Sequence, residues 1–402
     1  MVLFLHNRYR TIGGEERTVA DLLWLVREHL GEPAELLERR PRSDGWATSE
    51  RMRAAAGLLR GGLEPDEVEQ AVRLCGARVV HAHNLHPTLG WRALAAARAA
   101  GARVVLHLHQ YRLVCAIGVC FTRGAECTRC HGRNTLPGVR LNCRGSVPEA
   151  LAYGASLALW QRRLVEQADA VIVPSRYARE RLRELGAPLR WERVHVLPPP
   201  LRAPTGALGA HAAGSDTAGG VDRATGAKAT AGSYALVVSR LSPEKGVDVA
   251  IDACRIAGIP LVVAGDGPER AALERRAADG AVRFAGHVGD VELAVLRAGA
   301  ALALAPSRSG ETFGLAAAEA MAAGLPVAAS RVGALPELLD PEALVPVGDA
   351  RALAGAIARL AGDRAAGERG RERVRALCAP QVVAGALADI YNGTTQPGSS
   401  ST

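Results

Sequence analysis

The sequence contains almost no lysine and few aromatic residues. Of its 49 basic residues only Lys228 and Lys245 are lysines, and aromatic residues make up 4% of the chain. No run of about 18 apolar residues occurs, which argues against a membrane-spanning helix. Residues 1–6 are too short for the apolar core of a signal peptide and predict a first strand instead. We therefore expect a cytoplasmic protein.

The basic residues are unevenly distributed along the chain. The net charge is +8; residues 1–200 carry 29 Arg and 20 acidic residues, whereas the rest of the chain carries 20 basic and 21 acidic residues. A basic first half indicates either an anionic partner, such as a phosphorylated acceptor or the inner membrane face bound peripherally, or simply Arg-rich helix surfaces. Nucleic acid is not expected as a partner, because aromatic residues are sparse and no recognised nucleic-acid-binding module occurs.

Strand-like and helix-like segments alternate along the 402 residues, which predicts an α/β protein of about two domains built from βαβ units. We expect one lobe at 1–200 and a second at 234–378. The stretch 201–233 is rich in Ala, Gly and Thr and predicts a linker or insert, and 392–402 predicts a disordered tail. Apolar runs that predict strands lie near 2–5, 79–82, 104–107, 170–173, 194–197, 235–238, 261–264, 282–284, 301–304, 327–329 and 344–345.

Two glutamates eight positions apart, Glu311 and Glu319, follow one of these strands. Residues 315–323 are good helix formers. Glu311 is therefore expected in a loop between strand and helix, and Glu319 on the helix, facing the same crevice. Open parallel sheets bind ligands beyond the carboxyl ends of their strands, where a helix N-terminus favours phosphate. The alternative is a surface helix with two solvated carboxylates.

The one lysine with a recognisable setting, Lys245, follows the apolar run 234–238 in the segment S-R-L-S-P-E-K-G. An ammonium group is a compact charge suited to one phosphate oxygen, whereas a guanidinium such as that of Arg240 can bind two. Arg240 and Lys245 are therefore candidate phosphate ligands. The alternative for Lys245 is an ordinary solvated lysine at a helix start.

These two segments resemble the motifs of retaining glycosyltransferases of family 4, in particular S-R-S-G-E-T-F-G-L-A-A-A-E-A-M-A-A-G-L-P-V from position 307. The resemblance covers nearly the whole chain except 204–233 and the tail. It implies the GT-B fold, with two Rossmann-like, doubly wound lobes facing a central cleft and a helix near 379–391 returning to the first lobe. It also implies transfer of a sugar from a nucleotide-diphosphate donor to an acceptor hydroxyl, with retention and no catalytic metal, in cell-surface glycan or glycoconjugate synthesis.

The resemblance also assigns roles to residues. Arg240 and Lys245 would bind the donor diphosphate, Glu311 the transferred sugar and Glu319 the ribose. The remaining implied donor positions are the glycine loop before the first helix, the backbone around the E-T-F-G-L turn and the segment near the base: Gly13, Gly14, Phe313, Gly314, Leu315, His287 and Val288. His109 matches the family histidine beside the sugar. Because His107 shares its face of the strand, one of the two histidines could be structural. A GT-B-fold sugar-nucleotide epimerase and a non-catalytic binding protein that retains the fold remain alternatives.

Five of the eight cysteines fall within 29 residues. The C-x2-C pair Cys127 and Cys130, flanked by Cys115 and Cys143, predicts a four-cysteine zinc site that would order a Gly-rich loop. Cys120 is then the extra thiol, although it or a nearby histidine, His131, could replace a ligand. Some bacterial family 4 enzymes have a similar cysteine loop. Free or redox-active thiols are the alternative; disulfides do not suit a reducing cytoplasm, and haem attachment at C-x-x-C-H would need export.

Overall fold

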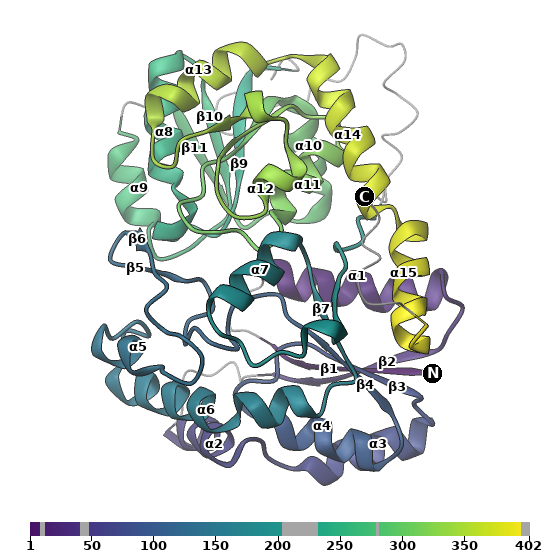
Figure 1. The fold of residues 1–402 in the computed structure, drawn as a ribbon. Helices are drawn as coiled ribbons and strands as arrows, with labels where there is room; N and C mark the ends of the chain where they lie inside the picture. Colours follow the sequence, from purple (N-terminus) through teal and green to yellow (C-terminus); the bar gives the residue numbers. More distant parts are fainter. Residues whose placement is uncertain (9–12, 41–47, 203–231, 279–280, 395–402) are drawn as a thin grey trace. The chain divides into compact units, whose positions relative to one another are not determined.

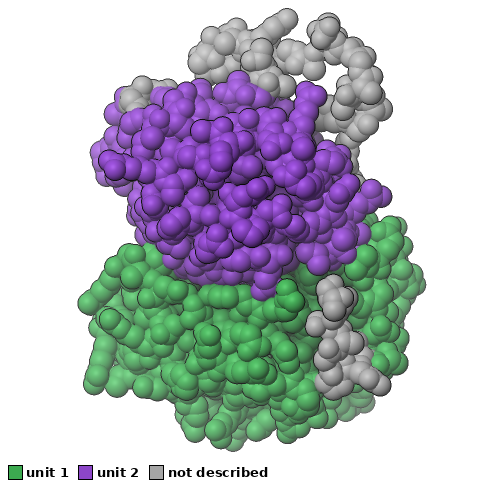
Figure 2. Space-filling view, turned by 45° about the horizontal axis from the view of Figure 1, so that its top comes forward, with its two compact units in different colours: residues 1–200, 380–402 green, residues 201–379 purple. Residues whose placement is uncertain are grey.

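The computed structural model describes residues 1–8, 13–40, 48–202, 232–278 and 281–394. Contacts divide the chain into two compact units, Met1–Pro200 with Pro380–Thr402 (unit 1) and Leu201–Ala379 (unit 2) (Figure 2). Each unit contains a six-stranded sheet with helices around it (Figure 1). The predicted α/β class is confirmed. Most of the predicted linker and tail, residues 203–231 and 395–402, lies outside the described residues.

The sheet of unit 1 is entirely parallel, in the order β2-β1-β3-β4-β7-β8. Its central strands are short and mostly apolar, and every residue of β1, β3 and β7 is buried, as expected for parallel strands covered on both faces. The edge strand β2 was not predicted, because charged residues interrupt its apolar pattern. The strands are β1 (Val2–Asn7), β2 (Ala34–Arg39), β3 (Val79–Ala82), β4 (Arg103–His107), β7 (Ala170–Val173) and β8 (Val194–Val196).

Helices cover both faces of this sheet. On one face α1 and α15 lie side by side (Figure 1), and Val383, Leu387 and Ile390 of α15 are buried with α1 and the strands. Their spacing of three or four residues gives the helix one apolar stripe. The helices of unit 1 are α1 (Gly14–Glu28), α2 (Thr48–Arg60), α3 (Pro65–Cys75), α4 (Gly90–Ala99), α5 (Leu136–Arg140), α6 (Val147–Glu166), α7 (Arg176–Glu184) and α15 (Pro380–Asn392).

Unit 2 repeats the architecture with the order β11-β10-β9-β12-β13-β14, again all parallel. Its strands are β9 (Tyr234–Val238), β10 (Leu261–Ala264), β11 (Val282–Gly286), β12 (Ala300–Ala305), β13 (Val327–Ser330) and β14 (Leu344–Val345). Its helices are α8 (Val247–Ala257), α9 (Arg270–Arg276), α10 (Asp290–Gly299), α11 (Leu315–Ala322), α12 (Leu335–Leu338), α13 (Ala350–Leu360) and α14 (Arg364–Cys378).

The strand order of each sheet reverses at one point. In unit 2 the chain proceeds from β9 toward β11 on one side and from β12 toward β14 on the other, so the reversal lies between β9 and β12. In unit 1 it lies between β1 and β3. Loops at the carboxyl ends of the strands diverge at such a reversal, which makes it the usual ligand site of an open parallel sheet.

No helix among the described residues has the length and apolar character needed to cross a lipid bilayer.

Candidate functional site

Lys245 and Glu311 meet at the strand-order reversal of unit 2. Lys245 ends the short turn Pro243–Lys245 after β9, and Glu311 lies in the loop after β12. The Lys245 Nζ atom donates a hydrogen bond to Glu311 Oε1 at 2.6 Å, and the Ser307 hydroxyl donates to the same oxygen at 2.6 Å. The two side chains are 26% and 20% exposed, so the pair is partly screened from water. The residue predicted to bind phosphate, Lys245, and the residue predicted to bind the sugar, Glu311, are therefore in direct contact.

The charge state of Glu311 follows from this contact. Burial alone would raise the pKa of Glu311, but the neighbouring Lys245 charge and the hydrogen bonds from Lys245 and Ser307 lower it below its usual value. The carboxylate is therefore ionised at neutral pH and balances the ammonium charge.

Arg240 is held on the same loop by a second carboxylate. Its guanidinium pairs with Glu244 Oε1, and its Nε atom donates to the Ser242 hydroxyl at 3.2 Å. Ser242 in turn donates to Glu244 at 2.6 Å. Burial would raise the pKa of Glu244, but the hydrogen bonds from Ser242, from the backbone and from Arg240 lower it overall. The Arg240 side chain stays 51% exposed, so part of it remains accessible to a ligand.

Glycines let the loops after β9 and β12 approach closely. Gly246 has φ +64°, and a Cβ there would lie 2.1 Å from the Pro306 carbonyl oxygen. Gly333 has φ +65°, and its Cβ would lie 2.3 Å from the Glu311 nitrogen. The backbone N–H of Arg308 donates to the Glu244 carbonyl at 2.7 Å. A Cβ at Gly246 would therefore force the Lys245 and Glu311 loops apart, and one at Gly333 would push the loop after β13 away from the Glu311 backbone.

The other predicted donor positions of unit 2 lie near the carboxyl edge but in separate contacts. Glu319 on α11 forms an ion pair with Arg297 of α10, in which both side chains are largely buried. Phe313 packs in the core, Gly314 has φ +92°, and Leu315 begins α11. His287 is exposed and Val288 half-buried just after the edge strand β11.

Four histidines form a stack at the carboxyl ends of β3 and β4 in unit 1. His81 lies on β3 and His107 on β4, His83 and His109 lie just beyond the ends of these strands, and the four rings stack on one face of the sheet. Hydrogen bonds join His83 Nδ1 to His109 Nε2 at 2.8 Å and His81 Nε2 to His107 Nδ1 at 3.2 Å. His81 Nδ1 also bonds the hydroxyl of Tyr391 at 2.7 Å. His107 and His109, which the sequence treats as alternatives, thus belong to one cluster.

Burial keeps this stack uncharged. It lowers the pKa of His81 and His109 to about 3 and the pKa of His83 and His107 well below 6.5. One possible ligand atom from each of His81, His83 and His107 lies within 4.8 Å of the others, as in a metal site. The rings of His81 and His107 are nearly parallel, however, at 8°. His81 Nε2 and His107 Nδ1 already bond each other and His81 Nδ1 bonds Tyr391, so we interpret the cluster as a hydrogen-bonded stack.

The glycine loop begins α1 beside this stack. The N–H of Gly13 donates to Glu16 Oε2 at 2.8 Å, and Gly14 is the first residue of the helix. Oxygens of Glu15 and Glu16 lie 4.0 Å from the ring nitrogens of His6. Sequence reasoning did not assign His6, His81, His83 or Tyr391 to a site; histidines repeating at strand ends were the available signal.

Comparison with known proteins decides the family. The model described as "Glycosyl transferase 4-like domain" matches residues 13–200, and "Glycosyl transferases group 1" matches residues 232–363. The chain belongs to the family 4 glycosyltransferases. Solved structures agree on the GT-B fold. Anabaena HepE in complex with UDP and glucose matches with a TM-score of 0.61 and 18% identity, over 97% of this chain and 99% of that one. Sucrose-phosphate synthase from Thermosynechococcus elongatus matches with a TM-score of 0.63 and 20% identity, over 98% of this chain and 98% of that one.

Curated relatives of this family 4 glycosyltransferase match in segments. The GDP-mannose-dependent alpha-(1-6)-phosphatidylinositol dimannoside mannosyltransferase of Mycobacterium tuberculosis is 47% identical over 106 residues, or 25% of this chain and 28% of that protein. The phosphatidyl-myo-inositol mannosyltransferase of Mycobacterium leprae is 37% identical over 172 residues, which are 39% of this chain and 45% of that protein. The alignments therefore span less than half the length of either relative.

In unit 1 of this glycosyltransferase the four predicted metal ligands gather around one pocket. Cys115, Cys127, Cys130 and Cys143 line it together with Cys120. His131, the other candidate ligand, is not among the lining residues.

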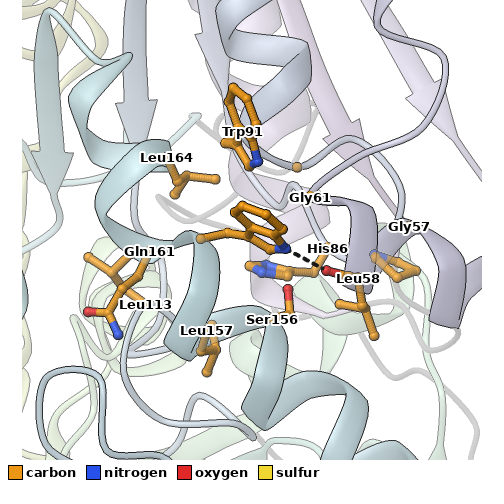
Figure 3. A pocket seen from close by; sticks show the side chains of 13 residues that line it. Gly57, Leu58, Gly61, His86, Trp91, Leu113, Ser156, Leu157, Gln161 and Leu164 are labelled. Atoms are coloured by element: carbon orange, nitrogen blue, oxygen red, sulfur yellow. Dashed lines mark hydrogen bonds between the residues drawn. The ribbon is translucent and has the colours of Figure 1, made fainter.

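A second pocket of unit 1 lies between α2, α4 and α6 (Figure 3). Trp91 lies against it 6.0 Å from the Trp160 ring, and the Trp160 indole donates to the Leu58 carbonyl at 3.1 Å. A Cβ on Gly61 would lie 2.2 Å from the Trp91 nitrogen. Its apolar lining and this tight packing identify it as a gap in helix packing.

Proposed function

We propose that this chain transfers a sugar from a nucleotide-diphosphate donor to an acceptor hydroxyl, with retention of configuration and without a catalytic metal. The observation that carries the proposal is the contact of 2.6 Å between Lys245 and Glu311 at the strand-order reversal of unit 2. A cation and a carboxylate are placed there by loops from two adjacent strands, the arrangement needed to bind a diphosphate and the sugar attached to it.

The cations would act on the leaving group. In the structure Lys245 is paired with Glu311 and Arg240 with Glu244. A bound diphosphate would accept hydrogen bonds from both cations. As the bond between the sugar C1 and the phosphate oxygen breaks, the leaving diphosphate gains negative charge, which the fixed cations stabilise. The acceptor oxygen then bonds C1 on the face that the diphosphate left, and its proton is released.

The remaining donor contacts follow the family assignment. Glu311 would hydrogen-bond the sugar hydroxyls and Glu319 the ribose. The backbone of Phe313, Gly314 and Leu315 would bind the diphosphate, since α11 begins there. His287 and Val288 would lie near the base.

Unit 1 would supply the surroundings of the sugar and acceptor. The neutral imidazole of His109, fixed by His83, suits a hydrogen bond to a sugar hydroxyl. Gly13 and Gly14 would bring backbone close to the donor. Glu15 and Glu16 lie in the first turn of α1, so a phosphate there would meet two carboxylates. We therefore assign the sugar end of the donor, rather than its phosphates, to this loop.

We further propose an anionic, lipid-linked acceptor in cell-surface glycan synthesis, reached at the inner membrane face. Two relatives are named for phosphatidylinositol-based acceptors. The excess of Arg over acidic residues in 1–200 would favour peripheral contact with anionic lipid.

A panel of GDP- and UDP-sugars tests the proposal. One donor should raise the unfolding temperature without added Mg²⁺ or Mn²⁺, because a ligand that binds only the folded state stabilises it by mass action. With an acceptor, nucleoside diphosphate should be released, and proton NMR of the early product should show retained anomeric configuration. Nucleotide-sugar conversion without acceptor would favour an epimerase, and an inverted product would contradict the proposed mechanism.

A further inference from the structure

Five cysteines from one 29-residue segment meet at one pocket of unit 1. Cys115 and Cys120 flank a turn after β4; Cys127 and Cys130 follow a small hairpin of β5 (Phe121–Thr122) and β6 (Ala125–Glu126); Cys143 lies beyond α5. The apolar part of the lining includes Phe121 and Leu141. The other three cysteines, Cys75, Cys254 and Cys378, lie elsewhere in the fold.

The segment that carries these cysteines has little regular structure. Between β4 and α6 it contains only the two-residue strands β5 and β6 and the five-residue helix α5. Three of its non-glycine residues, Cys120, Arg123 and Asn142, have φ between +47° and +53°. Left-handed backbone costs about 1–2 kcal/mol at each such residue. A long loop of this kind needs an additional constraint to stay ordered.

Two of the sulfur atoms, those of Cys115 and Cys130, have surroundings that suit metal-bound thiolates. Backbone N–H groups of Ile117, Gly118 and Cys120 donate to the Cys115 sulfur, and the Gly138 N–H donates to the Cys130 sulfur. The Cys120 thiol also hydrogen-bonds Cys115. Such donors stabilise the negative charge of a metal-bound thiolate and fix its direction, as outer contacts of metal sites do.

We propose that this pocket binds one Zn²⁺ through Cys115, Cys127, Cys130 and Cys143, with Cys120 donating its S–H to Cys115 instead of binding the metal. Binding converts four thiols into four thiolates and releases four protons to solvent, which leaves a complex of charge −2. Among the described residues no three of these sulfurs lie within 4.8 Å of one another. Binding must therefore draw the side chains inward across the pocket they line. The site is structural: it fixes the loop that follows His109.

Elemental analysis of the full chain, purified under reducing conditions without chelator, tests the proposal. About one zinc per chain is expected. Cys127→Ser and Cys130→Ser should reduce zinc to a small fraction of that value, whereas Cys120→Ser and the core control Cys254→Ser should retain it. Absence of zinc from the wild-type protein, or full retention in both Cys127→Ser and Cys130→Ser, would overturn the site. Equal loss in Cys120→Ser would overturn the proposed ligand set.

Titration of the wild-type protein with Co²⁺ tests the site even if a cysteine variant fails to fold. Zinc-depleted wild-type protein titrated with Co²⁺ should develop sulfur-to-cobalt charge-transfer absorption and the visible bands of a tetrahedral site, saturating at one equivalent. The spectrum should be unchanged in His131→Ala. A weak octahedral spectrum, or thiols that oxidise without protection by added zinc, would show that no four-thiolate site forms. None of these readouts depends on glycosyl transfer, so the zinc site and the proposed function fail independently.

Discussion

Lys245 is the only lysine among the described residues, and its charge is balanced by the carboxylate of Glu311. The ion pair keeps the ammonium charged and in place. It also stops two unpaired charges from being left in a partly buried site, which would be costly. A diphosphate can replace Glu311 as the partner of Lys245 with little change in the number of charged hydrogen bonds. Under the proposed function, the Lys245–Glu311 pair would exchange one charged partner for another when the donor binds.

At this scale we predict that Lys245→Ala slows transfer by about 10²-fold or more, the usual loss when a donor to a developing anion is removed. Arg240→Ala should have a similar effect. The measurement is kcat/KM with the donor found in the panel. The control is Arg255→Ala, which removes an ion-pair cation near the far end of α8. Unchanged kcat/KM in Lys245→Ala, with the fold intact, would remove this residue from the mechanism.

Helix α8 is flanked at both ends by glycines, and the surroundings of these two glycines differ. Both have left-handed backbone, Gly246 with φ +64° and Gly258 with φ +68°. A Cβ on Gly246 would strike the Pro306 carbonyl, whereas a Cβ on Gly258 would meet nothing within 4 Å. A substitution at Gly258 therefore measures the cost of left-handed backbone alone. The same substitution at Gly246 adds the cost of pushing the Lys245 and Glu311 loops apart.

We predict that Gly258→Ala costs about 1–2 kcal/mol in unfolding free energy and leaves kcat/KM unchanged. Gly246→Ala should cost more than Gly258→Ala and should also lower kcat/KM, because the Lys245 and Glu311 loops must separate. Urea unfolding and donor kinetics measure the two effects. Equal losses in both variants would show that the close approach at Gly246 is unimportant.

The elements that are easiest to predict from the sequence are strands whose residues are almost all buried. Strands such as β9 and β12 are continuous apolar runs, so their positions and the loops carrying Lys245 and Glu311 could be predicted. The strand β2 could not, since its charged residues lie at a sheet edge. Hairpin β5–β6 is too short for any periodicity. The histidine stack could not be predicted either, because it depends on the register of β3 with β4 and on Tyr391, 310 positions from His81.

Across the whole molecule, the buried histidines make stability depend on pH. Below pH 6.5 an unfolded chain protonates these histidines, whereas in the folded state the pKa of His81 and of His109 is about 3. The unfolded state therefore binds more protons, so stability is complete above pH 6.5 and falls as the pH drops toward 3. The slope is at most about 1.4 kcal/mol per pH unit for each such histidine.

We predict that the unfolding free energy of unit 1 already declines between pH 6.5 and 5, before most carboxylates titrate. Urea unfolding at a series of pH values measures this, and His107→Gln should make the decline shallower. Unit 2 serves as an internal reference, since its described residues include a single histidine, His287. Constant stability of unit 1 from pH 7 to 5 would contradict the prediction.

Unit 1 also depends on the last described helix of the chain. A chain ending at residue 379 would lack α15 and expose the apolar residues of α1 and the sheet that it covers. We predict that this truncated chain loses the cooperative unfolding transition of unit 1 and binds a hydrophobic dye. Retention of both native-like transitions would contradict this prediction.

The chain is made from its N-terminus, but unit 1 is interrupted by the whole of unit 2. When residue 200 leaves the ribosome, one face of the first sheet still lacks the helix containing Val383, Leu387 and Ile390. At 5–20 residues per second the missing helix follows after roughly ten to forty seconds, and unit 2 is complete before it arrives. During that interval the nascent first lobe presents an uncovered apolar face to chaperones and proteases. A ribosome that terminates early therefore yields no finished unit 1, whatever the state of unit 2.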